Sequence, residues 1–153
     1  MSYQKEKATE LFQLMQEVMD TLDDYSPAEL KDKPKEDVWS KQEILGHLID
    51  SSQYNIRRFT ESQFIPSPYK LESYQPNEMV EVNKYNMADI LHMTELFHNL
   101  NKQVVRIFAM VTDENLKIKI SDPKKEINTL QELMEDYIVH MQNHLNQITQ
   151  TVA

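Results

Sequence analysis

Apolar residues recur at intervals of three and four in four long stretches of this sequence. Such spacing gathers apolar side chains on one face of an α-helix, which turns by about 100° per residue. The four expected helices cover residues 4–23, 40–62, 86–110 and 130–149. Each helix would present one apolar stripe, so we expect the helices to pack side by side. The sequence therefore predicts an all-α protein, a four-helix bundle with long connections.

Capping motifs indicate where these helices begin. In a capping box, Ser or Thr is followed three residues later by Glu, and the two side chains satisfy free backbone N–H groups of the first turn. The sequence has such boxes at Ser26–Glu29, Ser40–Glu43 and Thr129–Glu132. The first box, followed by Pro27, predicts a short helical turn, and the other two begin the second and the last long helix. Asn86 is the expected N-cap of the third helix.

The irregular structure is expected in the connections. Residues 66–77 contain several prolines and predict a long connection, with a helical turn after Pro76. Residues 116–120 alternate Leu or Ile with Lys. This alternation predicts a short extended segment before the last helix, an edge strand with its lysines outward. Asp122-Pro123 then marks a turn.

The amino-acid composition agrees with a helical chain and limits its chemistry. There is only 1 Gly among 153 residues, and Gly disfavours helix interiors by about 1 kcal/mol relative to Ala. This glycine, Gly46, falls inside the second helix, where it either allows a neighbouring helix or side chain to approach closely or is simply tolerated. There is no cysteine, so disulfides, thiolate metal ligands and a cysteine nucleophile are excluded.

The charge distribution disfavours several classes of partner. The formal net charge is −9 and the basic residues form no stripe. Nucleic acid and anionic membrane surfaces are therefore not expected as partners, because both require clustered cations. No apolar run approaches the roughly 20 residues of a transmembrane helix, and the charged N-terminus lacks the apolar region of a signal peptide. We expect a cytoplasmic protein with a single domain over residues 1–153.

Two histidines on the last helix form the start of a candidate metal site. His140 and His144 are four residues apart, so on a helix they lie on one face, about one turn apart. Both fall at the edge of the inward-facing sector, where imidazole nitrogens need partners. A pair of this kind on an isolated helix is more often a surface feature than a metal site, unless a third ligand comes from another helix. His47, on the second helix, is the candidate third ligand.

Several polar residues follow His47 along the second helix. His47, Ser51, Tyr54 and Arg58 share one stripe beside the apolar arc, an arrangement typical of a pocket wall. The alternative is a solvated helix edge, which is favoured for Arg58 taken alone.

Three further residues have weaker claims to a role. Asp50, three residues after His47, is a candidate hydrogen-bond acceptor behind that histidine, or a base; the alternative is a surface carboxylate. His92 and His98 lie away from the apolar face of the third helix, so we expect both to be exposed to solvent and outside the site.

Two segments resemble signatures of the DinB-like superfamily. Residues 39–50, Trp-Ser-Lys-Gln-Glu-Ile-Leu-Gly-His-Leu-Ile-Asp, resemble its helix-two motif. Its final-helix motif is matched by Asp136-Tyr137 followed by His140, His144, Gln147 and Ile148. The resemblance covers nearly the whole chain, with the helices in the same order. It implies a four-helix bundle of up-up-down-down style, often a homodimer.

The resemblance also implies a metal site. In this family one residue of helix two and two of the last helix bind a divalent metal, commonly nickel or zinc, and these map onto His47, His140 and His144. An isomerase branch has a glutamate at one ligand position, and His140 departs from it. Three neutral imidazoles with an open position are typical of a catalytic site. Such imidazoles suit zinc, nickel, copper and iron alike.

The relatives implied by the resemblance set the expected function. They include thiol-dependent S-transferases, a thiol-dependent isomerase and YfiT-type metal-dependent hydrolases. We therefore expect a metal-dependent transferase or hydrolase acting on a small molecule, in which the metal activates water or a bound thiol. Because the chain has no cysteine, the thiol would be an external low-molecular-weight cosubstrate.

Two alternatives remain at the level of the sequence. One is a non-catalytic, metal-binding dimeric bundle used for ligand binding or interaction, and the other is that the histidines are merely structural. A homodimer is expected from the resemblance and from apolar residues available on helices one and three, namely Phe12, Met19 and Met93.

Overall fold

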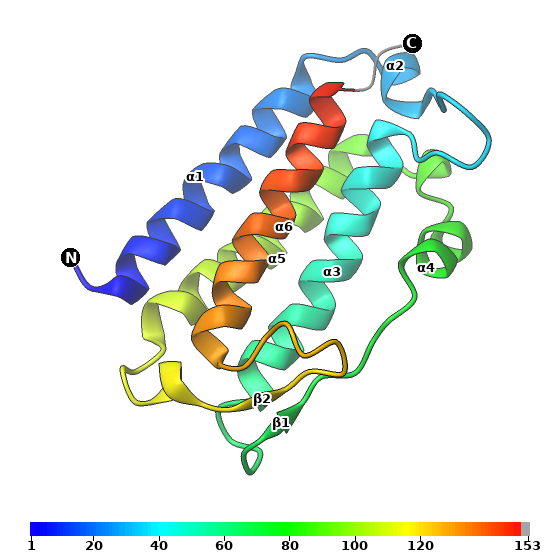
Figure 1. Ribbon diagram of the computed structural model, residues 1–153. Coiled ribbons are helices and arrows are strands. Elements are labelled where there is room, and N and C mark those ends of the chain that lie inside the picture. Colours follow the sequence, from blue (N-terminus) through cyan, green and yellow to red (C-terminus); the bar gives the residue numbers. More distant parts are fainter. Residues whose placement is uncertain (151–153) are drawn as a thin grey trace.

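Four helices of 21 residues each form the body of the protein. The computed structural model describes residues 1–150. Its long helices, arranged as in Figure 1, are α1 (Tyr3–Asp23), α3 (Lys41–Glu61), α5 (Ile90–Met110) and α6 (Leu130–Gln150). The predicted all-α four-helix bundle is confirmed. Residues 151–153 of the predicted single domain lie outside the described residues.

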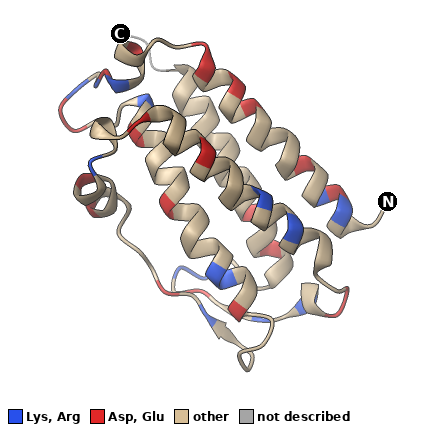
Figure 2. Ribbon diagram, turned by 180° about the vertical axis from the view of Figure 1, so that it is seen from behind, with Lys and Arg blue, Asp and Glu red and all other residues tan. Residues whose placement is uncertain are grey.

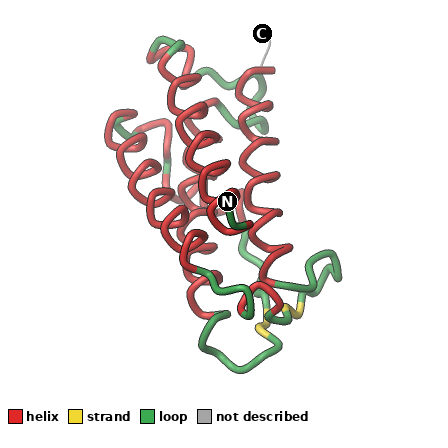
Figure 3. The backbone as a smooth tube through the Cα atoms, turned by 90° about the vertical axis from the view of Figure 1, so that its left-hand side faces the viewer, coloured by secondary structure: helices red, strands yellow, loops and turns green. Residues whose placement is uncertain are grey.

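Short elements occupy the connections, most of which lie at the two ends of the bundle (Figure 3). The short helices are α2 (Pro27–Lys31), α4 (Pro76–Asn83) and the 3-10 turns η1 (Tyr85–Met87) and η2 (Asn115–Lys117). Two strands, β1 (Tyr69–Lys70) and β2 (Ile120–Ser121), form a parallel pair. The connection predicted over residues 66–77 is thus partly ordered, and the turn expected after Pro76 is a complete short helix.

The three predicted capping boxes are all present. In the box that begins α3, Glu43 N donates to Ser40 Oγ at 3.0 Å, and Ser40 N donates to Glu43 Oε1 at 2.9 Å. Equivalent pairs begin α2 at Ser26 and α6 at Thr129. These side chains satisfy backbone donors that have no partner inside the helix. The helices therefore begin where the sequence indicates.

The predicted N-cap of the third long helix is wrong. Asp89 caps α5, and its side chain accepts from Leu91 N. Asn86 lies in η1, where its side-chain oxygen accepts a 2.6 Å hydrogen bond from Ser40 Oγ. The cause is Lys84, whose φ of 48° ends α4 in the left-handed region. The chain needs a further turn after it before α5 begins.

The extended segment predicted before α6 is shorter than expected. Leu116 belongs to the turn η2, and only the last residue of the predicted segment, Ile120, lies in strand β2. Leu116 and Ile120 are buried while the intervening lysines are exposed, so the predicted alternation of burial is confirmed. The partner strand β1 was not predicted, because two residues carry no usable alternation.

Hydrogen bonds at the helix ends give the direction of each helix. Lys41 Nζ at the start of α3 donates to the Ile148 carbonyl near the end of α6 at 2.5 Å, so these helices are antiparallel. Gln42, also at the start of α3, donates to the Ala88 carbonyl just before α5 at 2.9 Å, so α3 and α5 are parallel. Tyr3 and Glu135 join the starts of α1 and α6 at 2.6 Å.

The order of directions is therefore up, down, down, up, as Figure 1 shows. The up-up-down-down arrangement implied by the resemblance is wrong for this chain. The reason is the placement of the long crossover. Residues 62–89 return from the end of α3 to the end where α3 began, whereas the connection between α1 and α3 stays at one end of the bundle.

The core lies between the four long helices. Its largest fully buried side chains include Phe59, Phe97, Phe108, Leu11 and Met15. A polar network is buried among them: Tyr137 OH lies 2.8 Å from Ser52 Oγ and donates to Asn101 Oδ1 at 2.6 Å. Asn101 Nδ2 closes the ring by donating to Ser52 Oγ at 3.1 Å. One residue each from α3, α5 and α6 is therefore fixed in register.

In the ribbon view of Figure 2, Lys and Arg are scattered over several elements. Within residues 1–150, no helix combines the length and apolar character needed to cross a membrane. Phe12 remains 43 % exposed and Met19 is half-buried, but Met93 is buried. Met93 is thus withdrawn from the motivation for a homodimer, and the homodimer itself stays a prediction.

Candidate metal centre

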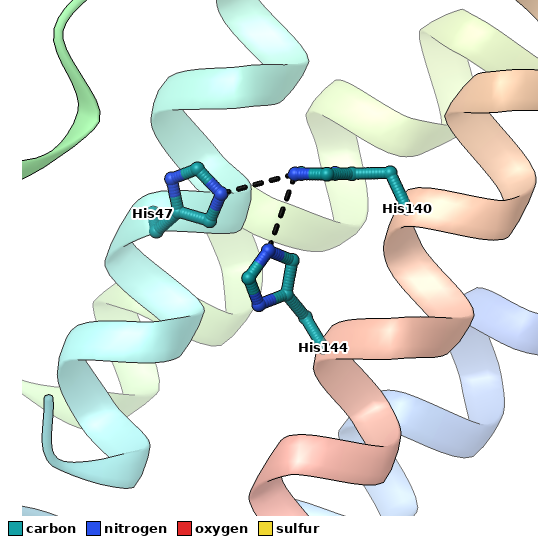
Figure 4. A group of neighbouring side chains, drawn as sticks. All are labelled: His47, His140 and His144. Carbon is teal, nitrogen blue, oxygen red and sulfur yellow. Dashed lines mark hydrogen bonds between the residues drawn. The ribbon is translucent and has the colours of Figure 1, made fainter.

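Three imidazoles converge between α3 and α6. His47 Nε2 lies 3.1 Å from His140 Nε2, which lies 3.2 Å from His144 Nε2. Figure 4 shows His47 reaching from α3 towards the two histidines of α6. One ring nitrogen from each residue lies within 4.8 Å of the other two. The structure thus brings together the three residues proposed as ligands from the sequence, and the ligand role itself stays a prediction.

The antiparallel packing of α3 and α6 places these side chains opposite one another. At one end the helices are tied by the bond from Lys41 to Ile148, and further along by the bond between Ser52 and Tyr137. His47 lies between the two tie points, so its register against α6 is fixed. On α6, the four-residue spacing puts His140 and His144 on one face. The cluster is therefore held by backbone and core contacts on both sides.

Burial keeps the three histidines neutral. Burial, together with the smaller effects of the neighbouring His144 and His140, lowers the pKa of His47 to about 3. Burial, followed by the effect of His144, lowers the pKa of His140 to about 4. Burial also lowers the pKa of His144, against the opposing effect of its bond to Gln147. Neutral imidazole is the form that binds metal, so the site is in its binding form at neutral pH.

A hydrogen bond to Gln147 also favours the form of His144 that can bind a metal. Its Nδ1 lies 2.8 Å from Gln147 Oε1. An amide oxygen only accepts, so Nδ1 carries the proton and the lone pair of Nε2 points into the cluster. This tautomer is the one that a metal ligand requires. The Trp39 ring covers the cluster from one side, with its centroid 4.9 Å from that of His47 and 6.4 Å from that of His144.

The donor set fits a divalent transition metal. Three neutral imidazole nitrogens suit several divalent transition metals alike, and a three-residue set leaves further coordination positions for water or substrate. A closed structural site would use four protein ligands. Among residues 1–150 no other cluster of three potential ligands occurs.

A cavity of about 500 Å³ lies beside the cluster. His47 and Arg58 of α3 form one wall, and Asp136 and His140 of α6 form the opposite wall. Residues of the two connections next to the strands, within 71–77 and 122–127, also line it, and Trp39 lines it beside His47. We call this space the site cavity. Its size is that of a small-molecule pocket.

Of the four residues of the polar stripe predicted on α3, His47 and Arg58 line the site cavity, and the other two do not. Ser51 lines a smaller pocket of about 80 Å³ that shares Arg58 and His140 with the site cavity. Tyr54 instead faces outward, 38 % exposed, and stacks on Tyr74 with ring centroids 4.5 Å apart. Arg58, for which a solvated edge was favoured, is half-buried. Its guanidinium donates to the Glu72 carbonyl and lies 5.4 Å from the Tyr74 ring centre.

Sequence reasoning assigned no role to Asp136, although its position could have given one. It lies four residues before His140, which itself lies four before His144, so all three share one stripe of α6. Partial burial, then the nearby Glu126 and Asp122, raise the pKa of Asp136. No hydrogen bond or ion pair engages its carboxyl within the described chain. It is therefore available to a molecule in the site cavity.

The remaining predicted residues lie outside the cluster. His92 is exposed, as expected, but His98 is half-buried on α5 rather than exposed, and both lie away from the site. Asp50 is not a surface carboxylate, because it is only 1 % exposed. Its Oδ1 accepts from Tyr85 OH and, at 3.2 Å, from Asn83 Nδ2.

Gly46 allows a close approach, the first of the two readings drawn from the sequence. A Cβ added at this residue would lie 2.0 Å from Cδ2 of Tyr85. The Tyr85 ring therefore lies flush against the backbone of α3, and its hydroxyl reaches Asp50 one turn further on. The returning crossover is anchored to α3 beside His47 through these contacts.

Comparison with known proteins agrees with this architecture. The chain is similar in structure to YfiT from Bacillus subtilis, described as a probable metal-dependent hydrolase with an unusual four-helix bundle topology. The two have a TM-score of 0.86 and 20% sequence identity, over 98% of this chain and 87% of that one. A comparison with curated protein sequences gives no match. The sequence model of the DinB superfamily matches residues 10–148. The chain therefore belongs to the DinB superfamily.

Proposed function

We propose that this protein is a divalent-metal-dependent enzyme acting on a small molecule, by hydrolysis or by transfer to a low-molecular-weight thiol. One observation carries the proposal: three neutral imidazoles converge at the edge of the site cavity. A metal held by His47, His140 and His144 would supply Lewis acidity and lower the pKa of a bound water or thiol. The similarity to a probable metal-dependent hydrolase supports the same class of reaction.

The residues of the site cavity would bind and orient the substrate. Trp39 and Tyr74 offer aromatic surface for an apolar part of the substrate. Arg58 uses its Nη2 on the Glu72 carbonyl, which leaves further N–H donors of the guanidinium for substrate oxygens. Asp136 holds or accepts a proton next to His140, and its raised pKa brings that exchange closer to neutral pH.

The test measures metal and turnover in the same samples. Untagged protein is expected to hold about one zinc or nickel ion per chain, and His47→Ala is expected to lower this occupancy at least about tenfold, because three ligands become two. His92→Ala is the matched control, since His92 is exposed and outside the cluster. Its occupancy should equal that of the unmodified protein.

Turnover then separates the two reactions. Metal-loaded and metal-stripped protein are incubated with activated esters, and separately with a chlorinated aromatic electrophile with and without a small thiol. Metal-dependent turnover of the ester indicates a hydrolase, and turnover that requires the thiol indicates a transferase. Full metal occupancy in His47→Ala with intact helices would refute the three-histidine site. If metal-loaded protein turns over neither the activated esters nor the chlorinated electrophiles, the result would favour the non-catalytic bundle.

A further inference from the structure

Two buried atoms on α3 have no hydrogen-bond partner within the described chain. They are His47 Nδ1 and Asp50 Oδ2. His47 is 3 % exposed and Asp50 is 1 % exposed, so bulk water does not satisfy them. An unpaired buried polar atom costs on the order of 1–3 kcal/mol, and native proteins pair the great majority of them. Two unpaired buried atoms only three residues apart in the chain require an explanation.

The metal-binding role proposed above determines whether His47 Nδ1 is a hydrogen-bond donor or an acceptor. A neutral imidazole carries one N–H, and His47 Nε2 must keep its lone pair to face the cluster. The proton is then on Nδ1, which makes this atom a donor that needs an acceptor. Figure 4 shows this second ring nitrogen of His47 on the side of the ring turned away from His140 and His144.

Helical spacing singles out one unpaired buried side-chain acceptor near His47 Nδ1. Besides Nδ1 itself, the unpaired buried side-chain atoms of residues 1–150 are oxygens of Gln4, Gln42 and Asp50. Gln4 lies on α1, and Gln42 is about 140° around α3 from His47 and more than one turn away. Asp50 is three residues after His47, a spacing at which side chains on a helix are neighbours.

The other oxygen of Asp50 is already fixed. Oδ1 accepts from Tyr85 OH and from Asn83 Nδ2, both on the returning crossover. Tyr85 is in turn held against Gly46. The carboxyl group is therefore clamped by one oxygen, and the second oxygen remains free for His47.

We propose that Asp50 is a positioning residue that accepts the Nδ1 proton of His47, directly or through one water molecule, and so fixes the tautomer and ring orientation that metal binding needs. The inference rests on the proposed metal site.

The decisive variant is Asp50→Asn. Tyr85 and Asn83 both donate towards the Oδ1 position, so the amide oxygen will stay there and the NH2 group will face His47. Nδ1 then becomes the acceptor and the proton moves to Nε2, the wrong tautomer for a ligand. Partners of this kind typically change metal affinity 10–100-fold. We expect Asp50→Asn to bind Zn²⁺ at least about tenfold more weakly, measured by competition with a chromophoric chelator.

Tyr85→Phe is the matched control. It removes one of the two hydrogen bonds to Asp50 Oδ1 but keeps the one from Asn83 Nδ2, and it leaves intact Oδ2, the oxygen that the proposal assigns to His47. It should lower the free energy of unfolding while changing zinc affinity less than about threefold, well short of the range for ligand-orienting partners. Equal losses of affinity in both variants would assign Asp50 a purely structural role and overturn the proposal, as would wild-type affinity in Asp50→Asn.

Nitrogen-detected NMR of the His47 ring provides a test that does not depend on zinc or on the variants folding. In the metal-free wild-type protein we expect the Nδ1–H tautomer, and the Nε2–H tautomer would overturn the proposal. If wild-type protein binds no zinc, the proposed function fails, while the NMR result still decides for or against the link between His47 and Asp50. If wild-type protein binds zinc and Asp50→Asn does so equally well, only the positioning role fails.

Discussion

At the scale of single residues, Gly46 shows how one missing side chain can organise a site. Its lack of a Cβ lets the Tyr85 ring lie on α3, which places the Tyr85 hydroxyl on Asp50. A glycine in a helix costs about 1 kcal/mol relative to alanine. This cost is offset by the close packing and by the buried hydrogen bond that the packing permits.

We predict that Gly46→Ala destabilises the protein by about 1–2 kcal/mol, although alanine is the better helix former. The new Cβ would lie 2.0 Å from Tyr85 Cδ2, so the ring must move and its bond to Asp50 is lost. Overpacking of this kind costs about 1–3 kcal/mol. Denaturant unfolding measures the change. In a Tyr85→Ala background the same substitution should be neutral or stabilising, and an equal loss there would contradict the explanation.

Helical spacing predicted that His140 and His144 share one face, and the family resemblance added His47, the candidate third ligand, to them, whereas the sequence left the role of Gly46 open between close approach and simple tolerance. It did not predict which of the nearby polar residues find partners. Asp50 was recognised as a neighbour of His47, but its contacts with Tyr85 and Asn83 depend on the path of the crossover. Lys84 adopts a left-handed conformation that no residue type in this stretch signals. Tertiary contacts of this kind lie beyond helical periodicity.

At the scale of secondary-structure elements, α3 and α6 are kept in register by the buried network of Ser52, Asn101 and Tyr137. Each of the three side chains makes at least two of the hydrogen bonds. A closed buried network specifies one relative position of its helices, because sliding would leave several polar groups unpaired. The network therefore also sets the position of His47 on α3 relative to the two histidines on α6.

We predict that Tyr137→Phe lowers the free energy of unfolding by about 1–3 kcal/mol. The hydroxyl is the donor to Asn101 Oδ1 at 2.6 Å, so its removal leaves a buried acceptor unpaired. Thermal or denaturant unfolding gives the value. Tyr54→Phe is the matched control, since Tyr54 is 38 % exposed and stacks by its ring, so its stability should change by less than about 0.5 kcal/mol.

Element boundaries were predicted best where capping chemistry marks them. The boxes at Ser40 and Thr129 gave the starts of α3 and α6. The length of α4, the start of α5 and the two strands were missed or underestimated, because they depend on the crossover and on pairing between distant short segments. The order of helix directions likewise depends on which connection runs the length of the bundle. The sequence did not predict it, because an amphipathic stripe looks the same whichever way the helix runs.

At the scale of the whole molecule, the buried histidines make stability depend on pH. In the unfolded chain a histidine has a pKa of about 6.5, whereas in the folded metal-free protein the pKa is about 4 for His140 and about 3 for His47. Between these values the unfolded state binds more protons than the folded state. The free energy of unfolding therefore falls as the pH drops from about 6.5 towards 4, and this contribution is fully present above pH 6.5.

We predict that metal-free protein unfolds at progressively lower denaturant concentration as the pH is lowered from 7.5 to 5. His140→Gln should reduce this dependence, since it removes one depressed group, whereas the exposed His92→Gln should keep the wild-type dependence. Denaturant titrations at several pH values provide the measurement. A midpoint that is flat over this range would mean that the cluster already takes up protons in the folded state.

The distance along the chain between His47 and His140 is 93 residues, and the two come from the first and last thirds of the sequence. An ion shared by both closes a loop of that length. A cross-link around about 100 residues removes unfolded-chain entropy worth roughly 4–5 kcal/mol. A chain without cysteine cannot form a disulfide for this purpose. The bound ion would thus act as a reversible cross-link, which forms when metal is supplied and is broken by acid or a chelator.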